Sequence, residues 1–144
     1  MKIGVDTTFL VQFTVREHSR HEAARVELER RISGGDILIL TPQVISEFIH
    51  VVTDERRFER PLSTAEALQI ARVWWEAAET EHVVPTSESV ATFCEWMTQF
   101  SLGRKRILDT MLAATYYTHG IHCLLSSNAR DYAVFGCFEV VVPQ

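Results

Sequence analysis

Cysteine is scarce in this sequence, and its few copies form no known metal or redox motif. The 144 residues contain only Cys94, Cys123 and Cys137, which are odd in number, widely spaced and without a Cys-x-x-Cys pair. This usage is typical of thiols buried in a protein of a reducing cytosol. We therefore expect buried cysteines and a cytoplasmic location.

The histidines also lack the spacing of a zinc site. Neither His18 with His21, nor His119 with His122 and Cys123, matches a zinc finger or a His-Glu-x-x-His helix. In a strand, the neighbouring His122 and Cys123 point to opposite faces. We interpret these residues as ordinary core and surface positions.

Long apolar runs are absent as well. No span reaches the twenty or so residues of a transmembrane helix, so we expect no membrane partner. Only a few apolar residues separate Met1-Lys2 from Asp6, so we also expect no secretory signal. The sequence has no internal repeat, low-complexity segment or linker, and its length suits one domain. A single domain over residues 1–144 is the prediction.

Charge is not strongly biased toward either sign. The net charge is −5, from 14 Lys and Arg and 19 Asp and Glu. Small basic clusters occur at residues 56–60 and 104–106. Acidic residues gathered in one cleft would hide a basic rim in the sum, so net charge neither indicates nor excludes a nucleic-acid partner.

Short apolar runs alternate with helical patterns along the chain. The runs of strand length are Ile3–Val5, Ile37–Leu40, His82–Pro85, Ile121–Leu125 and Phe138–Val142. The expected helices span Thr7 to about Phe13, Arg16 to about Ile32 and Ile107 to Thr118, and three more begin after Thr41, Ser63 and Thr86. Alternation of this kind implies right-handed crossovers and parallel strands. We predict an α/β fold, a three-layer α/β/α sandwich with a mostly parallel central sheet of about five strands.

Two helix starts carry clear signals. Thr41-Pro42 combines a hydroxyl N-cap with a proline in the first turn. Ser63 and Glu66 match a capping box. The helix that follows contains Trp74 and Trp75, and its spacing places at least one of them in the core instead of on a base-stacking surface.

Four acidic residues share one kind of position. Asp6 ends the first strand, Glu47 lies within the helix that begins at Pro42, and Asp109 lies in the first turn of its helix. Asp131 lies in the loop after the fourth strand. Each residue taken singly is explained as a cap, a surface charge or a turn residue. Because the carboxyl ends of parallel strands meet at one edge of the sheet, we expect the four to converge.

A cation would make such a cluster tolerable. Carboxylates a few ångströms apart repel and raise one another's pKa. Oxygen ligands alone suit Mg²⁺ or Mn²⁺ and do not suit zinc. Since Mg²⁺ takes phosphate oxygens readily, the cluster predicts a site for one or two of these ions and a phosphoester substrate.

The segments around these acids resemble those of a known family. They are Val5–Leu10, Thr41–Phe48, Asp109–Thr115 and Ser126–Tyr132. In order and spacing they resemble the PIN-domain family, and within it the VapC-type toxin ribonucleases of bacterial toxin–antitoxin pairs. The resemblance spans nearly the whole chain.

The resemblance implies roles for the acidic residues. Asp6, Glu47 and Asp109 would be metal ligands and catalytic residues, with Asp131 as the fourth acidic member. Asn128 occupies a position that is Asp or Asn in the family, so either Asn128 or Asp131 would supply the fourth ligand.

The resemblance also implies orienting and substrate-binding residues. Ser126 stands where the family usually has Thr and would hydrogen-bond to an acidic side chain, and Thr7 belongs to the same orienting group. Tyr132 replaces the more usual Phe. Arg104, Lys105 and Arg106 directly precede Asp109 and are well placed to hold RNA phosphates.

The implied function is Mg²⁺- or Mn²⁺-dependent endonucleolytic cleavage of RNA. Metal-activated water would be the nucleophile, which predicts a 5′-phosphate and a free 3′-hydroxyl. The implied partners are a cognate antitoxin and a second copy of the chain in a homodimer. The apolar helices around Trp74–Trp75 and Phe93–Phe100 are candidates for the dimer face.

Other functions fit the residues less well. A PIN module that binds RNA or protein without cleaving is the main alternative, and the intact acidic set argues against it. An aspartyl phosphatase needs a second Asp two residues after the first, where this chain has Thr8. A receiver domain needs paired acids near the first strand and a lysine near the last strand, and the chain has neither.

Overall fold

The computed structural model describes residues 1–144 and contains a sheet of 5 strands in the order β3-β2-β1-β4-β5. The strands are β1 (Lys2–Val5), β2 (Ile37–Leu40), β3 (Thr80–His82), β4 (Cys123–Leu125) and β5 (Glu139–Val141). Every neighbouring pair runs parallel. The predicted α/β class with a parallel five-stranded sheet is confirmed.

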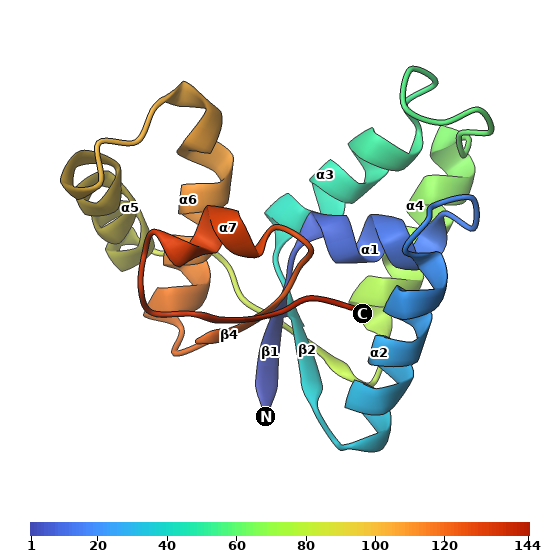
Figure 1. Ribbon diagram of the computed structural model, residues 1–144, viewed down its shortest axis with the longest axis horizontal. Helices are drawn as coiled ribbons and strands as arrows, with labels where there is room; N and C mark the ends of the chain where they lie inside the picture. The colour runs from blue at the N-terminus through green and yellow to red at the C-terminus, as the bar shows by residue number, and fades with distance from the viewer.

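Helices cover both faces of the sheet. They are α1 (Thr7–Thr14), α2 (His21–Ser33), α3 (Pro42–Val52), α4 (Thr64–Glu76), α5 (Ser87–Gln99), the 3₁₀ turn η1 (Arg104–Arg106), α6 (Ile107–Thr118) and α7 (Ala129–Ala133). Figure 1 shows α5 and α6 on one side of the sheet and α1, α2 and α4 on the other, which is the predicted three-layer arrangement. None of the helices combines the length and apolar character needed to cross a bilayer.

The centre of the sheet is packed most tightly around Gly4. A Cβ at this position would lie 2.9 Å from Leu124 Cδ2 and 3.0 Å from the Tyr116 ring. The same tyrosine donates hydrogen bonds from its hydroxyl to Val5 O (2.6 Å) and Ile39 O (3.0 Å). The glycine therefore lets α6 approach β1 closely, and Tyr116 fastens α6 to the carboxyl ends of two strands.

The predicted helix caps are present. Thr41 Oγ1 accepts a hydrogen bond from Val44 N at 3.2 Å, at the start of α3. Ser63 and Glu66 form both hydrogen bonds of the capping box of α4. Trp74 is 9% exposed and belongs to the core, as expected for at least one of the two tryptophans.

The predicted boundaries of four elements differ from those in the structure. The second helix begins at His21 and not near Arg16, since residues 15–20 turn twice, with His18 N donating to Val15 O and His21 N to His18 O. The third strand is β3, not residues 82–85. Its pairing with β2 ends where β2 itself ends, at Val83 N donating to Leu40 O. The fourth and fifth strands are shorter than predicted at their ends.

One of the cysteines expected to be buried lies on the exposed side of α5. Val90 is 46% exposed and Cys94 is exposed, whereas Trp96 is 9% exposed. Trp96 stacks on Phe135 with ring centroids 4.6 Å apart. This long-range aromatic contact sets the rotation of the helix, so the expectation of buried cysteines fails for Cys94.

The loop predicted after the fourth strand contains a short helix. Asp131 lies in α7, where its N–H donates to Asn128 O at 2.9 Å. Tyr132, in the same helix, is 1% exposed and packs edge-on against Phe138. Packing of this ring against the end of the chain holds α7 at the carboxyl-end edge of the sheet.

Candidate functional site

Asp6 lies at the junction of β1 and α1 and is 5% exposed. Ser126 Oγ donates a hydrogen bond to its Oδ2 atom at 2.6 Å, the contact to an acidic side chain that the family resemblance implies for this serine. Thr8 Oγ1 lies 3.4 Å from the same oxygen. Burial raises the pKa of Asp6, and the Ser126 hydrogen bond opposes that rise. Asp6 is thus a buried carboxylate with hydroxyl donors on one of its oxygens.

Glu47 projects from the second turn of α3 and is half-buried. Its Oε2 atom accepts a hydrogen bond from Thr7 Oγ1 at 3.2 Å, and its Oε1 atom accepts one from Gln43 Nε2 at 2.9 Å. Gln43 Nε2 also donates to Leu108 O at 2.8 Å, in the first turn of α6. We did not identify Gln43 from the sequence, where its only signal is its place one helical turn before Glu47.

Asp109 is harder to ionise than an ordinary aspartate. Its pKa is raised to about 6, by burial first and then by the negative charges of Asp6, Asp131 and Glu47. The nearby Arg106 acts in the opposite direction. All four acidic residues singled out in the sequence therefore lie close enough for three of them to disfavour ionisation of the fourth.

The two residues proposed for the fourth ligand position differ in their surroundings. Asp131 is half-buried in α7, and its charge acts on Asp109. Asn128 is exposed, and its backbone N–H donates to Ser126 Oγ at 2.9 Å. Ser126 therefore connects the Asn128 backbone to the Asp6 carboxylate.

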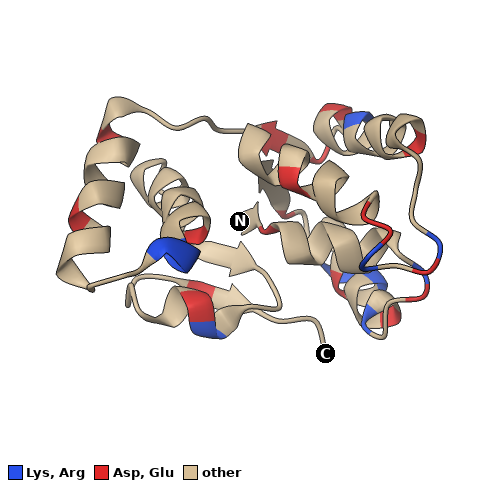
Figure 2. Ribbon diagram, turned by 90° about the horizontal axis from the view of Figure 1, so that it is seen from above, with Lys and Arg blue, Asp and Glu red and all other residues tan.

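The basic turn η1 lies at the rim of this acidic site, beside α6 and α7 (Figure 2). Arg104 and Lys105 are exposed, but Arg106 is half-buried. The Arg106 guanidinium donates a hydrogen bond to the backbone carbonyl of Asp131. Two of the three predicted phosphate-binding residues are thus open to solvent, while the third is part of the wall that joins η1 to α7.

Tyr132 contributes a buried hydroxyl near the acids. The side chain is buried, and its hydroxyl lies close enough to the Asp6 carboxylate to lower the pKa of Asp6, although the hydrogen-bond geometry is poor. Burial, followed by the charges of Asp6 and Asp109, raises its pKa well above the ordinary value, so it is a neutral O–H group. This O–H group is therefore available as a donor to the Asp6 carboxylate.

The donor chemistry of the site fits a hard divalent cation. All of its ligand candidates are carboxylate or amide oxygens. The repulsion among the carboxylates, which raises the pKa of Asp109, is what a bound cation would remove. As the side chains lie, no three acidic, His or Cys residues form a group that could hold an ion. Binding would require the half-buried acids to rotate toward Asp6.

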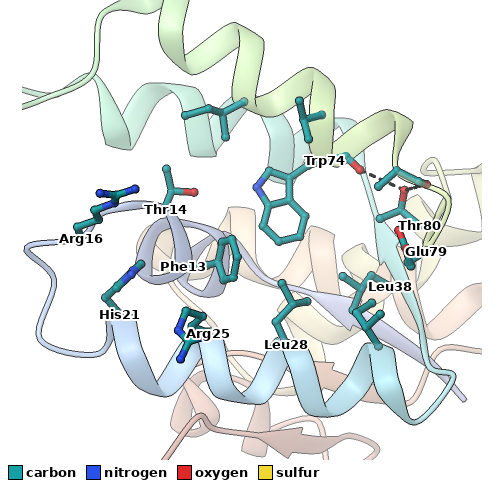
Figure 3. Close-up of a pocket in the computed structure, with 14 residues that line it drawn as sticks. Phe13, Thr14, Arg16, His21, Arg25, Leu28, Leu38, Trp74, Glu79 and Thr80 are labelled. Atoms are coloured by element: carbon teal, nitrogen blue, oxygen red, sulfur yellow. Dashed lines mark hydrogen bonds between the residues drawn. The ribbon is translucent and has the colours of Figure 1, made fainter.

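A large cavity lies elsewhere, between α1, α2 and α4 (Figure 3). Its volume is about 650 Å³. Its floor is apolar and includes Phe13, Leu28 and Trp74, and Arg16 and Arg25 lie at one end. None of the four acids lines it, so the cavity and the acidic site are separate features.

Solved structures with the same fold include toxins and toxin–antitoxin complexes. The structure of VapC20 of Mycobacterium tuberculosis, described as a toxin that cleaves the sarcin–ricin loop, has a TM-score of 0.68, 17% identity, and coverage of 91% of this chain and 93% of its own. VapBC-1 of nontypeable Haemophilus influenzae has a TM-score of 0.70, 12% identity, and coverage of 99% and 98%. DNA-bound VapBC of Salmonella typhimurium has a TM-score of 0.70, 13% identity, and coverage of 100% and 99%.

Comparison with curated protein sequences finds no match. The family model described as the PIN domain matches residues 3–134, which includes every segment that carries one of the four acids. The chain therefore belongs to the PIN-domain family.

Proposed function

We propose that this protein is a Mg²⁺- or Mn²⁺-dependent endoribonuclease that acts in the cytoplasm as the toxin of a type II toxin–antitoxin pair. The observation that carries the proposal is that Asp6, Glu47, Asp109 and Asp131 lie together, close enough for the other three charges, with burial, to raise the pKa of Asp109 to about 6. A folded protein gains nothing from such repulsion by itself, and a bound cation would relieve it. The acidic site lies at the carboxyl ends of parallel strands, which is where open α/β sheets bind ligands.

The proposed ligands are Asp6, Asp109 and Glu47, with Asp131 or Asn128 in the fourth position. When bound, Mg²⁺ or Mn²⁺ supplies an activated water nucleophile and offsets charge on the scissile phosphate. Hydrolysis by water would leave a 5′-phosphate and a free 3′-hydroxyl.

The other residues of the site hold the ligands and the substrate. Ser126 donates to Asp6 Oδ2 and so orients that carboxylate. Thr7 holds one oxygen of Glu47. Arg104 and Lys105, which are exposed beside the acids, would bind RNA phosphates and position the RNA strand for cleavage.

The proposed partner is an antitoxin, because solved structures of this fold include toxin–antitoxin complexes. An acidic site is complementary to an arginine or lysine of such a partner. The apolar cavity in Figure 3, with Arg16 at one end, suits an apolar segment with an acidic terminus. Val73→Asp at its rim should then weaken antitoxin binding in a pull-down, whereas Val26→Asp, exposed on α2 outside the cavity, should not.

We also propose a homodimer, which sedimentation analysis would test.

The nuclease proposal is tested with purified protein, a structured RNA and Mn²⁺. We expect cleavage by the wild type, its loss with EDTA, and a decrease of at least about 100-fold in Asp6→Asn, since a metal ligand is removed. Glu55→Gln, which changes an exposed acid outside the site, serves as the control and should cleave normally. RNA binding without cleavage, or equal cleavage by Asp6→Asn, would instead favour the module that binds without cutting.

A further inference from the structure

We propose that Gln43 is a positioning residue that sets the placement of Glu47 relative to Asp109 and thereby the affinity of the site for a divalent cation. This inference rests on the proposed metal-dependent function. Gln43 itself would not touch the cation, because its amide nitrogen is directed to the Glu47 carboxylate and to a backbone carbonyl.

The Gln43 amide group bridges the two helices that carry these acids. Its Nε2 atom lies 2.9 Å from Glu47 Oε1 on α3 and 2.8 Å from Leu108 O on α6. A primary amide has two N–H groups, so each acceptor takes one of them. Leu108 is the residue directly before Asp109 in the chain, so the second contact is made at the backbone that carries Asp109.

Little else connects α3 with α6. The two helices are not among the pairs that pack extensively on one another, whereas α3 packs on α1 and α4, and α6 on α5. The separation of their first turns is therefore not imposed by a helix interface. The Gln43 bridge supplies this constraint at the site itself.

The bridge also completes the hydrogen bonding of Glu47. Thr7 Oγ1 donates to Oε2 at 3.2 Å and Gln43 Nε2 donates to Oε1, so each carboxylate oxygen has one donor. Each oxygen retains a lone pair for a cation, because a carboxylate offers about four acceptor sites in total. A neutral amide orients Glu47 in this way without adding charge, whereas a lysine at this position would compete with the cation for the carboxylate.

Loss of a partner that holds a metal-binding carboxylate typically weakens metal affinity by about 10- to 100-fold. We therefore expect Gln43→Met, which keeps the side-chain length and removes both donors, to weaken Mn²⁺ binding about tenfold in calorimetric titrations of the metal-free protein. Ser46→Ala is the matched control. Ser46 is exposed on the same helix, and its hydroxyl donates hydrogen bonds only to the Pro42 and Gln43 backbone carbonyls. The Mn²⁺ affinity of Ser46→Ala should therefore equal that of the wild type.

A double-mutant cycle distinguishes positioning from a general loss of stability. If Gln43 acts through Glu47, then Gln43→Met should change the affinity little when Glu47 is already replaced by Gln. Gln43→Asn, whose shorter amide cannot span both acceptors, should behave like Gln43→Met and serves if the methionine variant folds poorly.

The outcomes separate this inference from the nuclease proposal. Wild-type protein that binds no Mn²⁺ would overturn the proposed function and this inference with it. Wild-type binding with unchanged affinity in Gln43→Met, or an equal loss with and without Glu47, would overturn the inference alone.

Discussion

Ser126 Oγ and Asp6 Oδ2 lie 2.6 Å apart although 120 positions separate the two residues in the chain. The parallel pairing of β1 with β4 explains this proximity, since Val5 and Leu125 are partners in the register and Asp6 and Ser126 directly follow them. Two neighbouring strands thus deliver a carboxylate and a hydroxyl donor to the same point of the sheet edge. The hydrogen bond is a consequence of sheet order.

Removal of the Ser126 hydroxyl should destabilise the protein. Ser126→Ala leaves the buried Asp6 carboxylate without its shortest hydrogen bond, and a hydrogen bond to a charged group contributes about 1.5–3 kcal/mol. Urea unfolding at neutral pH would measure the loss. Ser126→Thr keeps a donor and should lose less, and Ser33→Ala, exposed at the end of α2, should lose almost nothing. Equal losses in Ser126→Ala and Ser33→Ala would contradict the prediction.

Asp109 should make the metal-free protein less stable as pH rises. Its pKa is raised from 3.8 to about 6 in the folded protein, so between these values the unfolded chain ionises first. Stability therefore falls through this window and stays reduced above it. Asp109→Asn removes the effect and should be more stable than the wild type near neutral pH, by about 1 kcal/mol after allowance for solvent screening, with little difference in more acidic solution.

Unfolding experiments in EDTA at several pH values would test this sign. Asp54→Asn provides a control of the opposite sign, because a hydrogen bond from the Arg56 backbone and the neighbouring Arg57 lower the pKa of Asp54. That variant should lose stability at neutral pH. A stability loss in Asp109→Asn at neutral pH without metal would show that the carboxylate is not repelled as described.

The exposed cations of η1 should contribute to the salt dependence of RNA binding. Each phosphate contact to single-stranded nucleic acid adds about 0.7 to the slope of log affinity against log salt. The variant Arg104→Gln/Lys105→Gln should therefore reduce this slope by up to about 1.4. The measurement uses protein that also carries Asp6→Asn, so that the RNA is bound and not cleaved. Arg72→Gln, an exposed cation of α4, is the control. An unchanged slope in the double variant would remove η1 from the RNA path.

Gly4 should tolerate no side chain. The Cβ of Gly4→Ala would come within 2.9 Å of Leu124 Cδ2 and 3.0 Å of the Tyr116 ring. Overpacking of this kind costs about 1–3 kcal/mol, and thermal unfolding should show it. Gly103→Ala is the control, because no atom lies within 4 Å of its added Cβ and its φ is −94°. Similar stability of the two variants would indicate that α6 can move away from β1 without cost.

Local patterns were sufficient to predict the architecture. The alternation of apolar strand-length runs with helical spacing indicated the parallel sheet, and Thr41 and Ser63 mark helix starts that are present. The patterns failed where distant side chains decide the outcome. On α5 the contact of Trp96 with Phe135 turns Cys94 outward, and the packing of Tyr132 on Phe138 accompanies a helix around Asp131 where a loop was expected.

The sequence by itself determined the order of strands and helices along the chain and the placement of Asp6, Glu47 and Asp109 at strand ends or early helical turns. These follow from periodicity and capping, which act over a few residues. Only the tertiary structure decided that Gln43 reaches from Glu47 to Leu108 and that the charges of three acids act on Asp109. Such contacts join residues far apart in the chain, and they exist only when the sheet order and helix packing have brought those residues together.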